Sequence, residues 1–281
     1  MTEFEQDLFD DSRGRLTFDF QGFLYKLLRN WLFIVISVGI ALGIAYYNNV
    51  RKQNIYRLNT LISVETEQNP FFTANTSISF NWGGVSGKIG KIMTTLATRS
   101  HNELVVDSLQ YYKKYLKQGE YHLLDVYKNT PYEVHIDKSQ YQLLGYKIEI
   151  KARDANQYDL IIDFEENSRV SAQRYRDRSI ASFDVTPGVF KDTYVYGDSV
   201  RLPYLNVVVK KTSKTPKPDD QYFVQFLEFD GVVAAFQNSV SVGFFKSSNT
   251  VLSLAQSGTN KAKIVDYLNT TAEILRATEL R

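Results

Sequence analysis

The chain has 281 residues, enough for one or two substantial cores, and its 33 basic residues nearly balance its 31 acidic ones. The net charge therefore gives no sign of nucleic-acid binding, and the absence of cysteine excludes disulfides, thiolate metal sites and a cysteine nucleophile. Aromatic residues make up 14% of the chain, which is typical of strand-rich packing.

The first 50 residues predict three successive segments related to a membrane. Residues 1–19 are an acidic arm that we expect to be disordered and cytoplasmic. Residues 20–30 place large apolar side chains along one helical face, which predicts a helix lying in the membrane interface. Residues 31–50 contain no charged residue. At about 1.5 Å per residue, a helix of this length crosses a hydrocarbon core of about 30 Å.

Two other interpretations of residues 31–50 are a buried helix of a soluble protein and a cleaved signal peptide. A buried soluble helix normally keeps a polar stripe, which this run lacks. Gly43-Ile44-Ala45 weakly matches a signal cleavage site, but the preceding arm is too long and too acidic for a signal peptide. We therefore expect a retained transmembrane helix.

Basic and aromatic residues flank this apolar run at both ends. Those expected to anchor it at the two membrane interfaces are Lys26, Arg29, Trp31, Tyr46, Tyr47, Arg51 and Lys52. The basic residues on the two sides do not settle the orientation. Long domains are translocated largely regardless of charge, so the short arm and long remainder favour a cytoplasmic N-terminus.

Residues 51–258 are predicted to form one α+β domain on the opposite side of the membrane. Residues 56–64 alternate between apolar and polar side chains, which predicts a strand that starts close to the bilayer. A loop containing Gly83, Gly84 and Gly87 is expected next. Two helices should follow, over 89–96 and 104–112.

The middle of the chain is rich in aromatic and β-branched residues separated by turn residues, which predicts strands. We expect three strands in 132–164 to form a meander. Strands at 204–211 and 221–229 are expected to form a hairpin whose exposed loop carries Pro216 and Pro218.

The last part of this domain contains one ambiguous segment and two clear strand patterns. Residues 231–240 fit a short helix or a strand edge, and residues 239–246 and 249–256 predict strands. The predicted fold class is α+β, with a mixed or antiparallel sheet, packed helices and a long C-terminal helix.

Residues 259–281 predict the start of a long helix that is cut off. Thr259 is the predicted N-cap, and no Gly, Asn or Pro marks a C-terminus. The apolar face consists of Ile264, Tyr267, Leu268, Ile274 and Leu275. This stripe has no obvious partner within the chain, and an isolated helix of this length is marginal in water. We therefore expect it to pack against a returning segment or a neighbouring subunit.

No segment has the pattern of an active site. "GGVSGKIGK" approaches a phosphate-binding loop, but that motif requires glycine where Trp82 stands and Ser or Thr where Ile89 stands. His101, His122 and His135 lack ligand spacing and are expected to be structural or solvated. We expect no catalytic residue, no metal, no cofactor and no enzymatic activity in this chain.

Four arginines give residues 168–179 a basic character: Arg169, Arg174, Arg176 and Arg178. We expect a solvated surface loop here. A patch that contacts an anionic glycan or a lipid headgroup is the alternative.

Four stretches carry a resemblance to a known domain: "LYKLLRNWLFIVISVGIALGIAYY", "NIYRLNTLISVE", "VVDSLQYYKKYLKQGEYHLLDVYKNTPYEV" and "NTVLSLAQSGTNKAKIVDYLNTTAEIL". In this order they resemble the Wzz-type chain-length determinant domain of bacterial polysaccharide co-polymerases. The likeness is greatest to the N-terminal part of capsular and exopolysaccharide tyrosine autokinases. Asn260 stands where the family commonly has proline, whereas Lys261, Ala262 and Leu268 fit.

The resemblance implies an inner-membrane protein whose periplasmic domains assemble into a homo-oligomeric ring. Its partners would be the lipid bilayer, the polysaccharide polymerase and export machinery, and the growing glycan, with no nucleic acid. In the family a second span follows this region and, in the autokinase branch, a cytoplasmic kinase domain. We therefore expect Arg281 to be the end of a fragment.

Two other classes of protein also combine one span with strands or long helices. One is a periplasmic membrane-fusion adaptor of an export pump, which usually places a lipoyl-like strand pair around a helical hairpin. The other is a membrane-anchored sensor domain, which predicts a second span leading to a signalling helix.

Overall fold

The chain divides into two units, Met1–Lys52 and Gln53–Arg281. The computed structural model describes Tyr25 and residues 29–63, 84–215, 220–246, 248 and 250–279. The predicted acidic arm lies outside these residues. So does the predicted interfacial helix, apart from Tyr25, Arg29 and Asn30, of which Tyr25 and Arg29 are helical.

The first unit contains the helix predicted over residues 31–50. This helix, α2 (Trp31–Val50), buries none of its residues, and its apolar side chains point outward on all sides. Its last turn closes where the N–H of the C-cap Arg51 donates to the carbonyl of Asn49. A helix that is apolar all round is stable only when another apolar medium surrounds it.

The second unit is built partly on a three-stranded antiparallel sheet. Its order is β1 (Tyr56–Ser63), β15 (Val251–Gly258) and β14 (Val240–Phe244), with β15 in the centre. The strand predicted over 56–64 is therefore confirmed up to Ser63, and Val64 lies outside the described residues. The first and last strands of the domain pair along their whole length, from Tyr56 opposite Gly258 to Ser63 opposite Val251.

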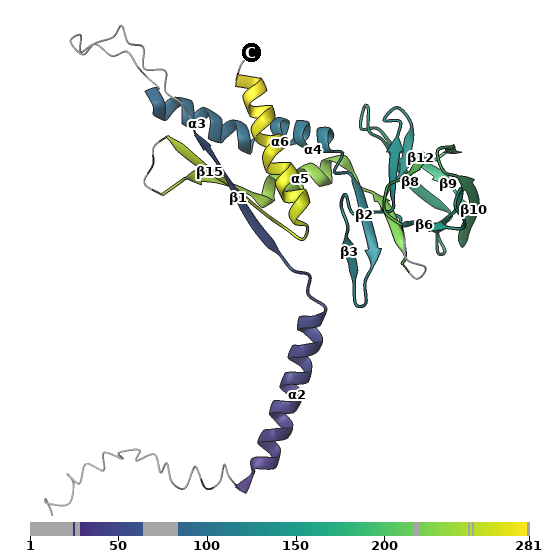
Figure 1. Cartoon of the computed structure of the whole chain (residues 1–281), viewed down its shortest axis with the longest axis horizontal. Helices are drawn as coiled ribbons and strands as arrows, with labels where there is room; N and C mark the ends of the chain where they lie inside the picture. The colour runs from purple at the N-terminus through teal and green to yellow at the C-terminus, as the bar shows by residue number, and fades with distance from the viewer. Residues whose placement is uncertain are drawn as a thin grey trace, which may run out of the picture. The chain divides into compact units, whose positions relative to one another are not determined.

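Helices α3 (Gly84–Ala97) and α6 (Lys261–Glu279) pack on one face of this sheet (Figure 1). Their buried apolar residues form a core with the two leucines of β15 that point to the same side. The members of this core are Ile89, Ile92, Leu96, Leu252, Leu254, Ile264, Leu268 and Leu275.

The predicted glycine loop before the first helix is wrong from Gly84 onward. Helix α3 starts at Gly84 and includes Gly87, and Gly83 lies outside the described residues. Glycine disfavours a helix by about 1 kcal/mol relative to alanine. The buried face of Ile89, Ile92 and Leu96 anchors the following turns and outweighs this preference.

The next helix starts and ends earlier than predicted. Helix α4 (Arg99–Leu109) starts at Thr98, whose hydroxyl accepts the N–H of His101 at 3.3 Å. It ends at Gln110, which is left-handed with φ 52°, so Tyr112 lies beyond the helix. A left-handed residue stops helix propagation, and strand β2 begins at Lys113.

Twelve strands between α4 and helix α5 (Phe229–Ser239) form two antiparallel sheets, drawn in the right half of Figure 1. The first sheet has the order β10 (Val189–Val195), β7 (Gln157–Asp163), β6 (Ile148–Ala152), β13 (Tyr222–Phe226), β2 (Lys113–Gln118) and β3 (Leu123–Asp125). The second has the order β11 (Ser199–Leu202), β12 (Leu205–Lys211), β5 (Tyr141–Leu143), β8 (Arg169–Arg174) and β9 (Ile180–Asp184), and β4 (Tyr132–Ile136) pairs with β12. Buried aromatic and aliphatic side chains of both sheets belong to one core, which also includes residues of α4, α5 and α6.

The predicted meander over 132–164 is only partly correct. β6 and β7 pair as neighbours, but β4 pairs with β12 in the other sheet. A short additional strand, β5, separates them in the chain and pairs with β8. The run 143–152, expected to be one strand, therefore crosses between the two sheets.

The predicted hairpin between 204–211 and 221–229 is wrong. β12 pairs with β4 and β11, whereas β13 pairs with β2 and β6. The ten-residue connection is long enough to pass from one sheet to the other. Pro216 and Pro218 lie within it but outside the described residues.

Two further segments differ from expectation. The arginine-containing run 168–179, expected to be a loop, contains β8 and the turn into β9. The ambiguous segment 231–240 lies mostly in helix α5, with Val240 starting β14. Both strands predicted after it are present, and the α+β class with antiparallel sheets is confirmed.

Candidate functional site

The candidate membrane anchor is α2, which is long and apolar enough to cross a membrane. The aromatic residues predicted at its ends, Trp31, Tyr46 and Tyr47, are all exposed. Arg51 places its guanidinium carbon 3.9 Å from the ring centroid of Tyr47. Arg29 and Lys52 are also exposed, whereas Lys26 lies outside the described residues.

The apolar face of α6 is buried inside the same chain, which corrects the expectation that it lacked a partner. Ile264, Tyr267, Leu268 and Leu275 are buried, and Ile274 packs against the larger core. They contact α4, β1 and β15, so the C-terminal helix covers the sheet and the first helices. This face is not available as a surface for a neighbouring subunit.

The start of α6 is fixed by polar contacts to strand β3 and the turn after it. Asn260, not the predicted Thr259, accepts the N–H of Lys263 with its side chain, at 3.2 Å, and donates to the carbonyl of Asp125 at 2.8 Å. Tyr127 donates to Asp266 at 2.8 Å. Because Asn260 acts as the N-cap and also binds β3, it connects α6 to the sheet that contains β3.

Three stacked aromatic rings connect the start of α6 to the core. Tyr111 stacks on Phe236, and Phe236 stacks on Tyr267, with ring centroids 4.9 Å apart in each pair. Tyr111 also donates to the carbonyl of Lys263 at 2.6 Å. Tyr267 donates to the buried side chain of Asn102, so α6 is joined to α4 through a hydrogen bond inside the core.

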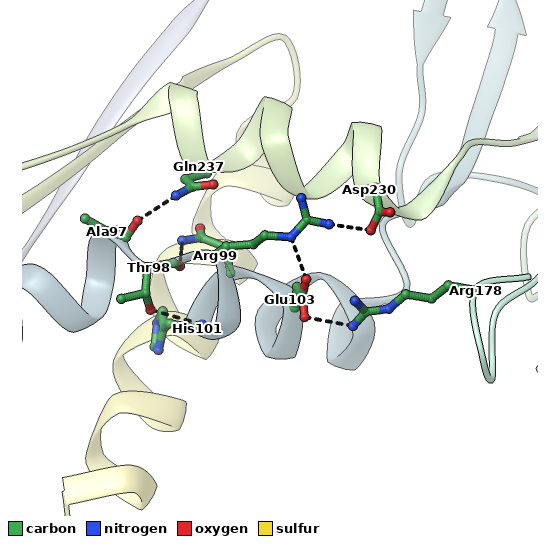
Figure 2. A network of polar contacts seen from close by, with 9 residues as sticks. Ala97, Thr98, Arg99, His101, Glu103, Arg178, Asp230 and Gln237 are labelled. Atoms are coloured by element: carbon green, nitrogen blue, oxygen red, sulfur yellow. Dashed lines mark hydrogen bonds and ion pairs between the residues drawn. The ribbon is translucent and has the colours of Figure 1, made fainter.

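A network of charged side chains joins α4, α5 and the turn between β8 and β9 (Figure 2). Glu103 binds Arg99 through one carboxylate oxygen and Arg178 through the other, both at 2.8 Å. Arg99 also binds Asp230 of α5 at 2.6 Å. The hydrogen bond from Arg178 and the one from Arg99 hold the pKa of the Glu103 carboxyl below its usual range.

The arginine run does not present four unpaired cations. Arg169 pairs with Asp184, Arg174 with Asp177, and Arg178 with Glu103. These carboxylates neutralise three of the four charges. The arrangement argues against the alternative of a patch for anionic glycans or lipid headgroups at this run.

A cleft of about 610 Å³ opens where the ends of β6, β12 and β13 meet. Tyr196 lies in its wall, with the ammonium of Lys211 4.7 Å from the ring centroid. Asp154 accepts the N–H groups of Asn156 and Gln157, and so holds a turn. Most charged groups here are used in contacts within the chain, so the cleft does not define a chemical reaction.

Buried ionisable groups are present, but they do not form a catalytic arrangement. Burial lowers the pKa of Lys113 to about 8, yet its ammonium donates to the carbonyl of Val134 at 2.9 Å. His101 is buried, and burial lowers its pKa. The side chains of His101, His122 and His135 come from separate elements. No group of three or more metal-binding side chains occurs within the described parts of the chain.

A smaller pocket of about 280 Å³ lies between α5, β2 and the turn from β15 into α6. Lys263 and Gln256 line it together with Asp125 and the ring of Phe236. Burial lowers the pKa of Lys263, because the apolar surroundings disfavour its charged form. Sequence reasoning missed this pocket, since most of its residues come from β2, β3, α5, β15 and α6, several of which lie far apart in the chain. The one signal available was Gln256, a glutamine at the position that continues the alternation of the buried Leu252 and Leu254 in β15.

Comparisons with known proteins leave the chain unassigned. No protein-family model matches it, and no curated protein is significantly similar to it.

Proposed function

We propose that this chain is the membrane and periplasmic part of a polysaccharide co-polymerase, a non-catalytic scaffold that regulates the length and export of a bacterial surface polysaccharide. In this proposal α2 crosses the inner membrane with the N-terminus in the cytoplasm. Residues 53–279 then face the periplasm, and several copies form a ring that works with the polymerase.

The observation that carries the proposal concerns two of the segments on which the resemblance rests. The strand after the candidate span, β1, and the strand that leads into the last helix, β15, are adjacent and antiparallel over eight residue pairs. Lys261, at the start of α6, lies 4.6 Å from the ring centroid of Tyr56 at the start of β1. The start of β1 and the start of α6 therefore lie at the same end of one sheet, and this pairing of two segments of the resemblance supports the proposal.

The buried face of α6 limits how such a ring could form. Because Leu268 and its neighbours are occupied within the chain, contacts between copies would have to use other surfaces. In the sheet that the described residues form, β1 and β14 are the edge strands, and we place the contacts between copies there because an edge strand presents backbone N–H and C=O groups to a further strand.

Two experiments test the proposal. Deleting the gene in the bacterium that encodes it should change the length distribution of the surface polysaccharide on gels, and the intact gene should restore it. A variant gene with Leu42→Arg and Ile44→Arg in α2 serves as the matched control and should not restore it, since charges at mid-span oppose insertion. An unchanged length distribution after deletion would contradict the proposal.

The second experiment measures assembly. Detergent-solubilised protein should have the mass of a large oligomer by light scattering at micromolar concentration. A monomer under these conditions would count against a ring-forming scaffold.

A further inference from the structure

The hairpin formed by β2 and β3 carries two large exposed side chains at its tip. Tyr121 is 51% exposed and Leu124 is 42% exposed, and neither belongs to a hydrophobic core. The turn is tight, because the N–H of Gly119 donates to the carbonyl of His122 at 3.1 Å. A Cβ added to Gly119 would lie 3.3 Å from Cδ1 of Leu124, so this leucine side chain lies against the turn.

This tip is hydrogen-bonded to the segment that leads into β1. The side-chain amide of Gln53 donates to the carbonyl of Leu123 at 2.9 Å. Ile55, two residues after Gln53, is 76% exposed. Ile55, Tyr121 and Leu124, which we call the tip patch, therefore each lie within two residues of a partner in this hydrogen bond. Single exposed apolar residues need no explanation, whereas a cluster of them marks an interaction surface.

A second contact fixes the hairpin to the rest of the domain. At the end of β3, the carbonyl of Asp125 accepts from the side chain of Asn260, which precedes α6, at 2.8 Å. Figure 1 shows the start of β1, the start of α6 and the turn between β2 and β3 at the same end of the second unit. The tip patch is therefore held in place by hydrogen bonds to two other segments.

The covalent chain limits how far this segment can lie from the end of α2. Helix α2 ends at Val50, three residues before Gln53. Consecutive Cα atoms are about 3.8 Å apart, so the Cα atoms of Val50 and Gln53 are separated by at most about 11 Å. The polar interface on each side of the hydrocarbon core is about 5–7 Å thick. When α2 crosses the core, the tip patch is therefore within reach of the interface.

We propose that the tip patch lies in the bilayer interface at the C-terminal end of α2, as a second contact of this chain with lipid. The inference rests on the proposed crossing of the membrane by α2. Tyrosine favours this region because its ring is apolar and its hydroxyl is polar, and Ile55 and Leu124 add apolar area. Glu120, an exposed carboxylate in the same turn, opposes a deep position, so the contact is shallow.

The contact depends on α2 and differs from the contacts proposed between copies. A single myristoyl chain gives only marginal, reversible membrane binding, so three side chains do not retain the domain on a membrane by themselves. A second copy of the chain is the other occupant to test. The bilayer is favoured because the chain connection keeps the tip patch near it, whereas β1 and β14 offer the strand edges to other copies.

Site-specific fluorescence tests this inference. The chain has no cysteine, so one introduced cysteine carries the only probe. The full chain with Leu124→Cys is labelled with bimane and placed in nanodiscs of phosphatidylethanolamine and phosphatidylglycerol that contain lipid with a nitroxide near the headgroup. We expect a blue-shifted emission, a loss of intensity caused by the nitroxide lipid, and protection from aqueous iodide.

The matched control is Leu61→Cys, at a leucine that is 48% exposed and lies five residues after Tyr56 along β1. A strand rises about 3.4 Å per residue, which places this control about 17 Å from the start of β1. Its probe should be quenched by iodide and not by the nitroxide lipid. Equal quenching by the lipid at positions 61 and 124 would overturn the proposal.

A probe on Ile40→Cys separates failure of this contact from failure of the anchor. Quenching by lipid at position 40, without quenching at positions 121 and 124, overturns the contact and leaves the crossing of α2 intact. No quenching at position 40 overturns both. A blue shift at position 124 that appears only with two copies per nanodisc, without quenching by lipid, identifies a second copy as the occupant and also overturns the proposal. If Leu124→Cys does not fold, as judged by near-ultraviolet circular dichroism, Tyr121→Cys decides.

Discussion

Glu103 is the point at which three elements of the domain are joined by charge. Its side chain is 20% exposed. Its two oxygens bind Arg99 on the same helix and Arg178 in the turn between β8 and β9. Charge-assisted hydrogen bonds are stronger than neutral ones, but the two arginines are about half exposed, which reduces the gain through solvent screening.

Glu103→Gln should lower the free energy of unfolding at pH 7 by about 1–2 kcal/mol, because both guanidinium groups lose their anionic partner. The pKa of Glu103 is lower in the folded state than its usual value of 4.5. Its contribution is therefore fully present above that value and is lost as the pH falls through the folded pKa. The difference between the two proteins should be constant near neutrality and narrow below pH 4.5. Urea unfolding at several pH values measures this.

A control for this comparison is Glu120→Gln, which changes an exposed carboxylate that has no ion pair among the described residues. It should leave the unfolding midpoint nearly unchanged. Equal losses in the two variants would contradict a specific role for Glu103.

A second prediction at this scale concerns the hydrogen bond from Tyr267 to Asn102 in the core. Tyr267→Phe removes the donor and leaves the side-chain oxygen of Asn102, which is 1% exposed, without its partner. We expect a loss of about 1–3 kcal/mol in thermal or urea unfolding. Tyr141→Phe, at a hydroxyl without a hydrogen bond to the described residues, should cost less than half as much.

At the scale of single elements, α6 illustrates what the sequence can and cannot predict. The 3.6-residue spacing identified its five inward-facing residues correctly, since a helix that covers a sheet needs such a stripe. The spacing carries no information about what the stripe contacts. Two of its partners, β1 and α4, lie more than 150 residues earlier in the chain, so the sequence pattern alone does not reveal them.

The same limit explains the errors in the strands. Alternation and composition located β1, β6, β7 and β12, because each buries one face. Strand pairing depends on long-range register, so the meander expected from neighbouring strands was partly wrong and the expected hairpin was wrong. The pocket at Gln256 was missed for the same reason. In contrast, β8 was missed because its two arginines, Arg169 and Arg174, are typical of a solvated loop. The alternate positions Val170 and Ala172 are nevertheless buried.

The position of α6 can be tested with one buried and one exposed residue of the same helix. Leu268→Ala, at a side chain 4% exposed, should cost about 2–5 kcal/mol, because it leaves a cavity between α6 and the sheet. Val265→Ala, at a side chain 43% exposed, should cost less than about 0.5 kcal/mol. Thermal unfolding of the two variants measures the difference. Similar costs would contradict the packing described for α6.

For the whole molecule, the relevant feature is that α2 contributes no residue to the hydrophobic cores of the folded unit that follows it. Among the described residues, both hydrophobic cores consist of residues from Tyr56 onward, and none of their members belongs to the first unit. The residues that would be in contact with lipid and those that stabilise the domain are therefore different sets. Loss of the anchor should change where the protein is found without changing how stably it folds.

Removing residues 1–52 tests this separation. The shortened protein should stay in the soluble fraction after cell disruption and still unfold in one cooperative transition, because its cores remain complete. The unmodified chain should sediment with membranes and resist extraction by high salt or carbonate, since about 20 apolar residues insert stably into a bilayer. A matched variant, Ile36→Arg with Ile40→Arg, keeps the length of α2 but places charges near its centre, and should shift the chain out of the carbonate-resistant fraction. Membrane retention of the shortened protein would mean that residues 53–281 carry a second membrane contact. Loss of its cooperative transition would mean that α2 contributes to the stability of the domain.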